Sequence, residues 1–255
     1  MRPLLETCLG CLGLFIMLLV FFETRIKMLD GNGDSVLYVE CNKGHSTYVN
    51  ILLAYPGINI NTPNNHEWTP LHVASMRGHK EIVTSLLAHP GINVNAVTEK
   101  GRNSLHLASM YGHVEVVTSL LAHPDIDVNA VTEEGRNSLH LASFYGHQDI
   151  VTTLTQDAGI DVDSVSKDGY TPLHLAYSNI VDILLTVPDI YVNTIDKNGF
   201  TALRSSIENK YGNITTTLLE PIKIEKKSNH GITVIWSDMA SICFFYVILW
   251  SWDKK

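Results

Sequence analysis

One motif recurs along most of this chain at a fixed spacing of 34 residues. Its most regular element is a Leu-His pair, found at Leu71-His72, Leu105-His106, Leu139-His140 and Leu173-His174. The register extends back to Leu37-Tyr38 and, after a shorter step of 30 residues, forward to Leu203-Arg204. A fixed period of this length is typical of a solenoid, in which each copy stacks only on its neighbours.

Each copy predicts two short helices. A polar turn with a glycine, such as Gly101 or Gly135, comes first, and a residue suited to cap a helix follows it. The predicted capping residues are Thr69, Asn103, Asn137, Thr171 and Thr201. The first helix carries the Leu-His pair and ends at "GH"; the second, as in "VEVVTSLLAHP", has apolar residues at helical spacing. Helices this short are unstable alone in water, so they must be stabilised by stacking on adjacent copies.

The stretches "TPLHVASMRGHKEIVTSLL" and "TPLHLA" resemble the ankyrin-repeat family, whose units begin with T-P-L-H-x-A. The resemblance extends over about three quarters of the chain, as about six copies between residues 30 and 220. It implies an all-α ankyrin-repeat solenoid of helix–turn–helix units with β-turn fingers. It also implies a concave face made of fingers and first helices, with the second helices at the back.

Three copies depart from the pattern. The first, "GDSVLYVECNKGHSTYVNILL", lacks T-P-L-H and is predicted to be an N-terminal cap. The fifth, "LHLAYSNIVDILL", omits four residues at the "GH" turn, which predicts a shorter first helix and the weakest stacking at residues 176–181. The sixth has Arg204 in place of the histidine and is predicted to be a degenerate C-terminal cap.

Two histidine positions recur, one after the first leucine and one after the turn glycine, as in His106 and His113. Equivalent histidines in successive copies would lie roughly 10 Å apart, too far to share a metal ion. A neutral imidazole can instead donate from one nitrogen and accept at the other. We therefore expect these histidines to bond the turns between copies, as the ankyrin resemblance also implies, with no metal and no cofactor.

The copies differ most at the end of the first helix and directly after the turn glycine. Exposed aromatic, Met and Arg residues on one face are the usual anchors of a protein interface. If such residues instead packed between adjacent helices, they would be buried. The candidate partner-binding residues are Trp68, Met76, Arg77, Arg102, Met110, Tyr111, Arg136, Phe144, Tyr145 and Tyr170.

Apolar segments flank the repeats. Residues 9–22 form an uninterrupted apolar run that fits an uncleaved signal anchor or a cleaved signal peptide; residues 232–252 are long enough to span a membrane, although they include Asp238,. More Lys and Arg lie on the repeat side of each segment, which predicts that the repeat domain faces the cytosol. The predicted organisation is an apolar N-terminal segment, a repeat domain, a basic linker and an apolar C-terminal segment, at 1–29, 30–220, 221–231 and 232–255.

The composition narrows the function. A formal net charge of −8 argues against a nucleic-acid-binding protein,. No G-x-S-x-G, G-x-x-x-x-G-K-[ST] or H-E-x-x-H motif occurs, and no domain-sized segment remains for an enzyme. The acidic stretch "DGNGD" at 30–34 lacks the later glutamate of a calcium loop and is interpreted as a turn. We therefore expect a monomeric, membrane-tethered, non-catalytic scaffold that binds a protein or peptide. The alternative is a soluble adaptor or secreted effector with a cleaved signal peptide.

Overall fold

The computed structural model describes residues 28–156 and 159–208. Within these ranges helices follow one another in pairs, and every first helix begins after a polar turn. The helices are α2 (Val36–Lys43), α3 (Ser46–Leu53), α4 (Pro70–Arg77), α5 (Lys80–Leu87), α6 (Ser104–Tyr111), α7 (Val114–Leu121), α8 (Ser138–Tyr145), α9 (Gln148–Thr155), α10 (Pro172–Leu175), α11 (Ser178–Leu185) and α12 (Ala202–Glu208). Each pair corresponds to one copy of the motif, and α12 begins the sixth.

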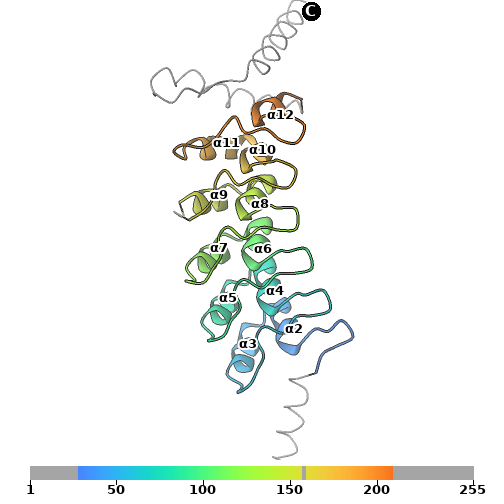
Figure 1. Ribbon diagram of the computed structural model, residues 1–255. Helices are drawn as coiled ribbons and strands as arrows, with labels where there is room; N and C mark the ends of the chain where they lie inside the picture. The colour runs from blue at the N-terminus through green and yellow to red at the C-terminus, as the bar shows by residue number, and fades with distance from the viewer. Residues whose placement is uncertain (1–27, 157–158, 209–255) are drawn as a thin grey trace, which may run out of the picture. The chain divides into compact units, whose positions relative to one another are not determined.

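The described residues form two compact units. Unit 1 comprises residues 28–108 and 115–126, and unit 2 comprises residues 109–114, 127–156 and 159–208. In unit 1, α2 packs on α4 and α3 packs on α5. In unit 2, α10 lies between α8 and α12, while α11 packs on α9 (Figure 1). Each unit therefore stacks first helices on first helices and second helices on second helices.

The predicted helix starts are confirmed. The Oδ1 atoms of Asn103 and Asn137 accept hydrogen bonds from the amides of His106 (2.9 Å) and His140 (3.0 Å). The Oγ1 atoms of Thr69 and Thr201 accept longer bonds from the amides three residues later. These bonds satisfy amides that the first turn of a helix leaves without an internal partner.

The predicted helix ends at "GH" are also confirmed. The first helices α2, α4, α6 and α8 each stop directly before a glycine with positive φ. The φ angles are 78° at Gly44, 74° at Gly78, 83° at Gly112 and 79° at Gly146. Only glycine adopts this left-handed conformation at little cost, so the position fixes where the first helix ends.

The core of each unit consists of the apolar residues that the repeat places at helical spacing. In unit 1, Leu71 and Leu86 are buried, and in unit 2 Leu139, Leu154 and Leu184 are buried. The first-helix alanines Ala74, Ala108 and Ala142 are fully buried, as small residues at close helix contacts must be. The described residues contain no strand; extended pairing is limited to two isolated bridges, Leu29 with Ser35 and Ile195 with Thr201.

The fifth copy confirms the prediction of a shorter first helix. Its α10 has four residues, whereas α8 in the preceding copy has eight. The chain leaves α10 at Ala176 in an extended conformation and enters α11 directly after Tyr177. The four missing residues therefore remove the last turn of the helix and its glycine cap.

No helix in the described ranges is long and apolar enough to cross a membrane. The two apolar segments predicted to reach a membrane, 9–22 and 232–252, lie outside these ranges, as does the basic linker at 221–231.

Candidate functional site: the finger face

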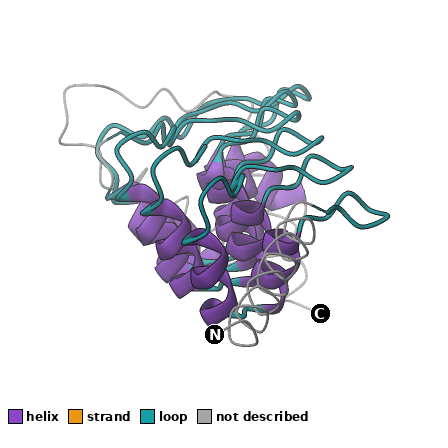
Figure 2. Ribbon diagram, turned by 90° about the horizontal axis from the view of Figure 1, so that it is seen from below, coloured by secondary structure: helices purple, strands orange, loops and turns teal. Residues whose placement is uncertain are grey.

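The loops between successive copies project to one side of the helices as hairpin turns, the fingers (Figure 2). The same two hydrogen bonds close each finger in unit 2. The Thr132 amide donates to the Arg136 carbonyl (3.0 Å), and the Ser166 amide donates to the Tyr170 carbonyl (2.8 Å). The amides of Gly135 and Gly169 then donate back to the carbonyls of Thr132 and Ser166. Each finger is therefore a rigid turn of the same shape, which presents the residues that differ between copies.

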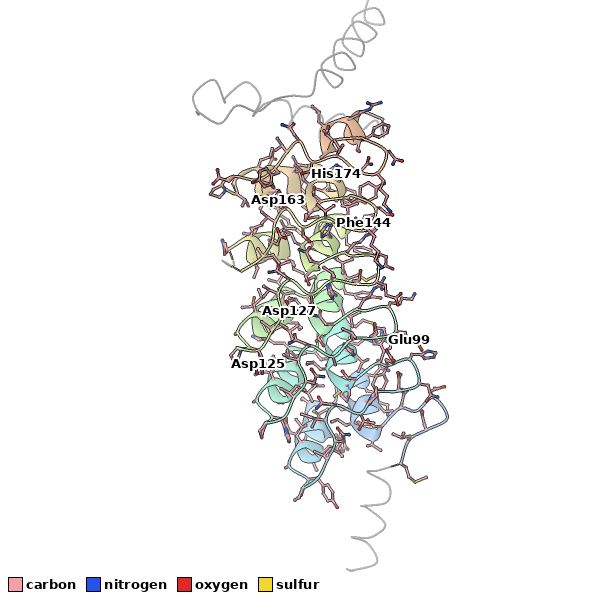
Figure 3. The ribbon with its side chains drawn as sticks, in the orientation of Figure 1. Glu99, Asp125, Asp127, Phe144, Asp163 and His174 are labelled. Atoms are coloured by element: carbon pink, nitrogen blue, oxygen red, sulfur yellow. The ribbon has the colours of Figure 1, made fainter. Side chains whose placement is uncertain are left out.

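The histidine after the first leucine joins one copy to the next. His72 Nε2 lies 2.8 Å from the carbonyl oxygen of Ala96, and the amide of Thr69 donates to Nδ1 (3.0 Å). Since a carbonyl only accepts, Nε2 carries the proton and Nδ1 accepts. His140 repeats this arrangement with the Tyr170 carbonyl, and His174, labelled in Figure 3, repeats it with the Phe200 carbonyl. The structural role predicted for these histidines is confirmed.

These rings are neutral. Burial lowers the pKa of His72 to about 4 and that of His140 to about 4, and it also lowers the pKa of His174. Their carbonyl partners favour the protonated form but do not outweigh burial. A neutral ring is what the network requires, because Nδ1 must keep its lone pair to accept from the backbone amide.

The histidine after the turn glycine has a second role. In unit 2, His147 Nε2 donates to the Met110 carbonyl (3.0 Å), and a Cβ on Gly112 would lie only 2.8 Å from the His147 ring. In unit 1, the ring of His79 covers Gly44 in the same way. His45 instead lies 2.7 Å from Glu40 of its own copy. The prediction that these histidines join copies thus holds for His147, but His45 bonds within its copy.

Four of the candidate partner-binding residues belong to unit 1. Trp68 and Arg102 are half-buried beside their fingers, and the Trp68 ring contacts His72 edge-on at 6.2 Å. Met76 is half-buried at the end of α4, whereas Arg77 is exposed and its Nε donates to Asn42 Oδ1 (3.0 Å). Arg77 therefore also joins neighbouring copies, a role that the sequence did not predict.

The other six candidates belong to unit 2, where half of them are exposed. Tyr111 is 49% exposed, and Phe144 and Tyr145 are each 44% exposed. Met110, Arg136 and Tyr170 are half-buried. Packing between adjacent helices is thus excluded for Phe144 and Tyr145, which remain available for contact.

An aromatic and cationic cluster surrounds Phe144. The rings of Phe144 and Tyr145 meet edge-on at 5.1 Å, and the Arg136 guanidinium lies 5.9 Å from the Phe144 ring centre. Tyr145 stacks with His147 at 6.4 Å. The structure therefore brings a finger residue, Arg136, to the last turn of α8, and the two recurring candidate positions form one surface (Figure 3).

The short α10 explains why this cluster is exposed. The equivalent of Phe144 in other copies, Met76 or Met110, is half-buried, whereas the last turn of α8 has no counterpart on α10 to lie beside. Tyr177, directly before α11, occupies the register of the missing "GH" histidine, and its ring lies against Gly146, 3.6 Å from a Cβ built there. Tyr177 therefore replaces the histidine ring, and it is itself exposed.

The sequence analysis missed one set of exposed residues. Val131, Val165 and Ile195 occupy one register at the start of successive fingers, and all three are exposed although they are apolar. A recurring β-branched residue in an otherwise polar turn was the available signal. We define the finger face of unit 2 as these three residues together with Arg136, Phe144, Tyr145, Tyr170 and Arg204.

The described residues contain no group of three or more His, Cys, Asp or Glu side chains able to hold a metal ion. The "DGNGD" stretch is a turn, as predicted: Asp30 Oδ1 accepts from the amides of Asn32 (2.8 Å) and Asp34 (2.9 Å). Its carboxylate is thus engaged in the backbone of its own loop.

The repeated helix pairs, the capped turns and the buried histidines together define a helical repeat protein of the binding-scaffold type. A family model described as "Ankyrin repeats (3 copies)" matches residues 8–98, 92–166 and 156–230. The chain belongs to the ankyrin-repeat family. Ankyrin repeats mediate protein–protein interaction, and proteins built from them are in general non-catalytic.

Solved structures agree with this assignment. An ankyrin repeat protein designated EF0377 is 25% identical, with a TM-score of 0.67, over 72% of this chain and 96% of its own. An ankyrin repeat domain from Acinetobacter baumannii AYE is also 25% identical, with a TM-score of 0.64, over 72% and 95%. The ankyrin repeat domain of Bcl-3, described as a unique member of the IkappaB protein family, is 27% identical, with a TM-score of 0.67, over 74% and 86%. No curated protein matches the chain in sequence.

Proposed function

We propose that this protein is a non-catalytic scaffold that binds a partner protein through the finger face of unit 2. The observation that carries the proposal is the cluster of Phe144, Tyr145 and Arg136, in which two large aromatic side chains remain exposed. Aromatic and Arg residues supply most of the energy in protein interfaces because they bury large areas and lose little side-chain entropy. The buried histidine network holds the fingers rigid, so the surface needs little reordering when it binds.

The proposal is tested by substituting Tyr111, Phe144 and Tyr145 jointly with alanine. All three side chains are exposed, so the fold should survive, with an unchanged circular dichroism spectrum. Proteins captured by the native chain and identified by mass spectrometry should be lost, with affinity for a captured partner reduced at least 100-fold. Tyr48 of α3, also exposed, provides the matched control, and its replacement by alanine should leave capture unchanged. Equal capture by the triple variant would refute the proposal.

We propose further that the apolar terminal segments tether the repeats to a membrane, with the repeat domain facing the cytosol. This proposal is supported by the apolar run at 9–22, the span-length segment at 232–252, and the Lys and Arg residues on the repeat side of each,. The alternative is a secreted or soluble adaptor whose N-terminal run is a cleaved signal peptide. Carbonate washing of membranes should leave the full-length chain in the pellet, and N-terminal sequencing should find Met1. Release by carbonate, or a start beyond residue 22, would favour the alternative.

A further inference from the structure

Three apolar side chains form a row along the fingers of unit 2. Val131, Val165 and Ile195 are 51%, 52% and 50% exposed, and each occupies the same position two residues after the conserved-register asparagine or aspartate of its loop. Polar residues would normally fill such exposed turn positions, since an exposed apolar side chain contributes nothing to folding there. A β-branched apolar residue at three successive fingers therefore indicates a surface that contacts something apolar.

The fingers hold this row at a regular spacing. The Lys167 amide donates to the Glu134 carbonyl (2.9 Å), and the Lys197 amide donates to the Asp168 carbonyl (3.1 Å), so each fingertip is bonded to the next. The turn-closing bonds are also the same, since the Asp196 amide donates to the Phe200 carbonyl (2.8 Å) as in the other two fingers. Successive copies are stacked helices, so successive members of the row lie about 10 Å apart.

This spacing matches one conformation of a bound chain. An extended peptide advances about 3.1–3.3 Å per residue, so three residues span about 10 Å. A peptide in which every second residue faces the row would place its side chains only about 7 Å apart, out of register by the second finger. A helix would need about seven residues per finger, at 1.5 Å each. Only an extended segment with apolar residues at every third position reaches all three side chains within seven residues.

Charge adds to the description of the partner. The described Lys and Arg residues of unit 2 are Arg136, Lys167, Lys197 and Arg204. All four belong to fingers or to the first helix that follows one. The second helices and their outer loops carry carboxylates and no cation in the described residues of this unit: Asp149, Asp161, Asp163, Asp182 and Asp189. An acidic segment would therefore be attracted to the fingers and repelled by the opposite side.

We propose that the finger face of unit 2 binds an extended, acidic segment of a partner protein whose apolar side chains recur at every third residue and contact Val131, Val165 and Ile195. The inference rests on the proposed function and specifies the partner. The β-branched side chains are stiff, so they lose little freedom when they are covered. The interleaved cations pair with the acidic residues between the apolar ones.

The test is selection of a random peptide library on the full-length chain. We expect enriched peptides with apolar residues at i, i+3 and i+6 and with Asp or Glu between them. Replacing Val131, Val165 and Ile195 jointly with Thr, which preserves the branched shape, should weaken an enriched peptide at least tenfold. Tyr191→Ser, at an exposed aromatic residue of an outer loop, is the matched control and should change nothing. Added salt should weaken binding of an enriched peptide as well.

The outcomes separate this inference from the proposed function. Enrichment of apolar residues at every second position, enrichment of a seven-residue helical pattern, or no enrichment would overturn it. Equal binding by the Thr variant would do the same, even if the triple alanine variant of Tyr111, Phe144 and Tyr145 abolished capture of partner proteins. That combination would leave the proposed function intact and move its contact surface away from the finger row.

Discussion

At the scale of single residues, the buried histidines decide how the copies hold together. His72 receives an amide from its own copy and donates to a carbonyl of the next, and His140 does the same. Both bonds use ring nitrogens in fixed roles, so no other common side chain of similar size can replace the ring. The sequence predicted this role correctly, because the histidine recurs at a position where helix ends leave backbone groups without partners.

We expect His72→Ala to destabilise the protein by about 2–4 kcal/mol, because it leaves a buried amide and a buried carbonyl without partners. Urea unfolding followed by circular dichroism at pH 7 measures this loss. His66→Ala is the matched control, since the His66 side chain is 70% exposed. A loss no larger than that of the control would contradict the structural role of His72.

The same histidines make stability depend on pH. The pKa of His72 and that of His140 fall from 6.5 in the unfolded chain to about 4 in the folded one, so the unfolded state binds protons first as pH falls. Their contribution is complete above about pH 6.5 and is lost as pH falls toward 4, by about 2 kcal/mol per histidine between pH 7 and pH 5. Urea unfolding at the two pH values should show this loss, and His72→Ala should show a smaller one. Equal pH dependence in the variant would exclude His72 as a source.

Another residue-scale feature is a ladder of asparagines in the outer loops. The Nδ2 atoms of Asn61, Asn95 and Asn129 each donate to a carbonyl 30 residues later, at 2.8, 2.6 and 2.6 Å. Asp163 occupies the next position and accepts from the Tyr191 amide (3.0 Å), but a carboxylate has no hydrogen to donate,. Burial and, less strongly, Asp161 raise the pKa of Asp163, which means that the charged form costs stability,.

We therefore expect Asp163→Asn (Asp163 is labelled in Figure 3) to stabilise the protein by about 1 kcal/mol at pH 7, since the amide restores the missing donor,. The raised pKa means that wild-type Asp163 loses its penalty as it is protonated, so the difference should shrink at acidic pH. Urea unfolding at pH 7 and pH 4 measures both effects. The matched change Asp182→Asn, at an exposed position of α11, should have little effect. A destabilised Asp163→Asn protein would show that the ladder does not extend to this copy.

At the scale of elements, the four-residue α10 is the main departure from regularity. The sequence predicted it, because the omitted residues fall between the Leu-His pair and the second helix. It did not predict that Phe144 and Tyr145 would be exposed as a result. Exposure of a residue in one copy depends on the length of the helix in the next, and the copy's own sequence carries no sign of it. Tyr177 was missed for the same reason, since its role appears only when its ring is seen against Gly146.

Inserting Ser-Phe-Tyr-Gly between Ala176 and Tyr177 would restore the missing turn with the residues of the preceding copy. We expect α10 to lengthen and to cover Phe144 and Tyr145, which raises the free energy of unfolding by about 1 kcal/mol or more. Binding of partner proteins should weaken, because the cluster becomes buried. Hydrogen exchange and urea unfolding measure the first effect, and capture experiments measure the second. Insertion of Gly-Ser-Gly-Gly is the control, since it is a poor helix former; equal protection by both insertions would contradict the prediction.

At the scale of the molecule, the period of 34 residues was enough to predict the fold, since each copy has the same requirements. The choice of contact residues was only partly correct. Aromatic and Arg residues were expected at the interface on chemical grounds, and several are exposed. Val131, Val165 and Ile195 were missed because an apolar residue in a sequence is first assigned to the core. Arg77 was chosen for its chemistry, but it bonds Asn42.

The shortened copy also shows how such an array can change. Four residues are close to one full turn of an α-helix, which has 3.6 residues. Their removal therefore returns the chain to nearly the same direction, and α11 and α12 pack on α9 and α10 as later copies should. A loss of two residues would have pointed every following helix to the wrong side. Whole turns are thus the units in which a repeat can be trimmed to reshape its surface while the copies beyond it remain in phase.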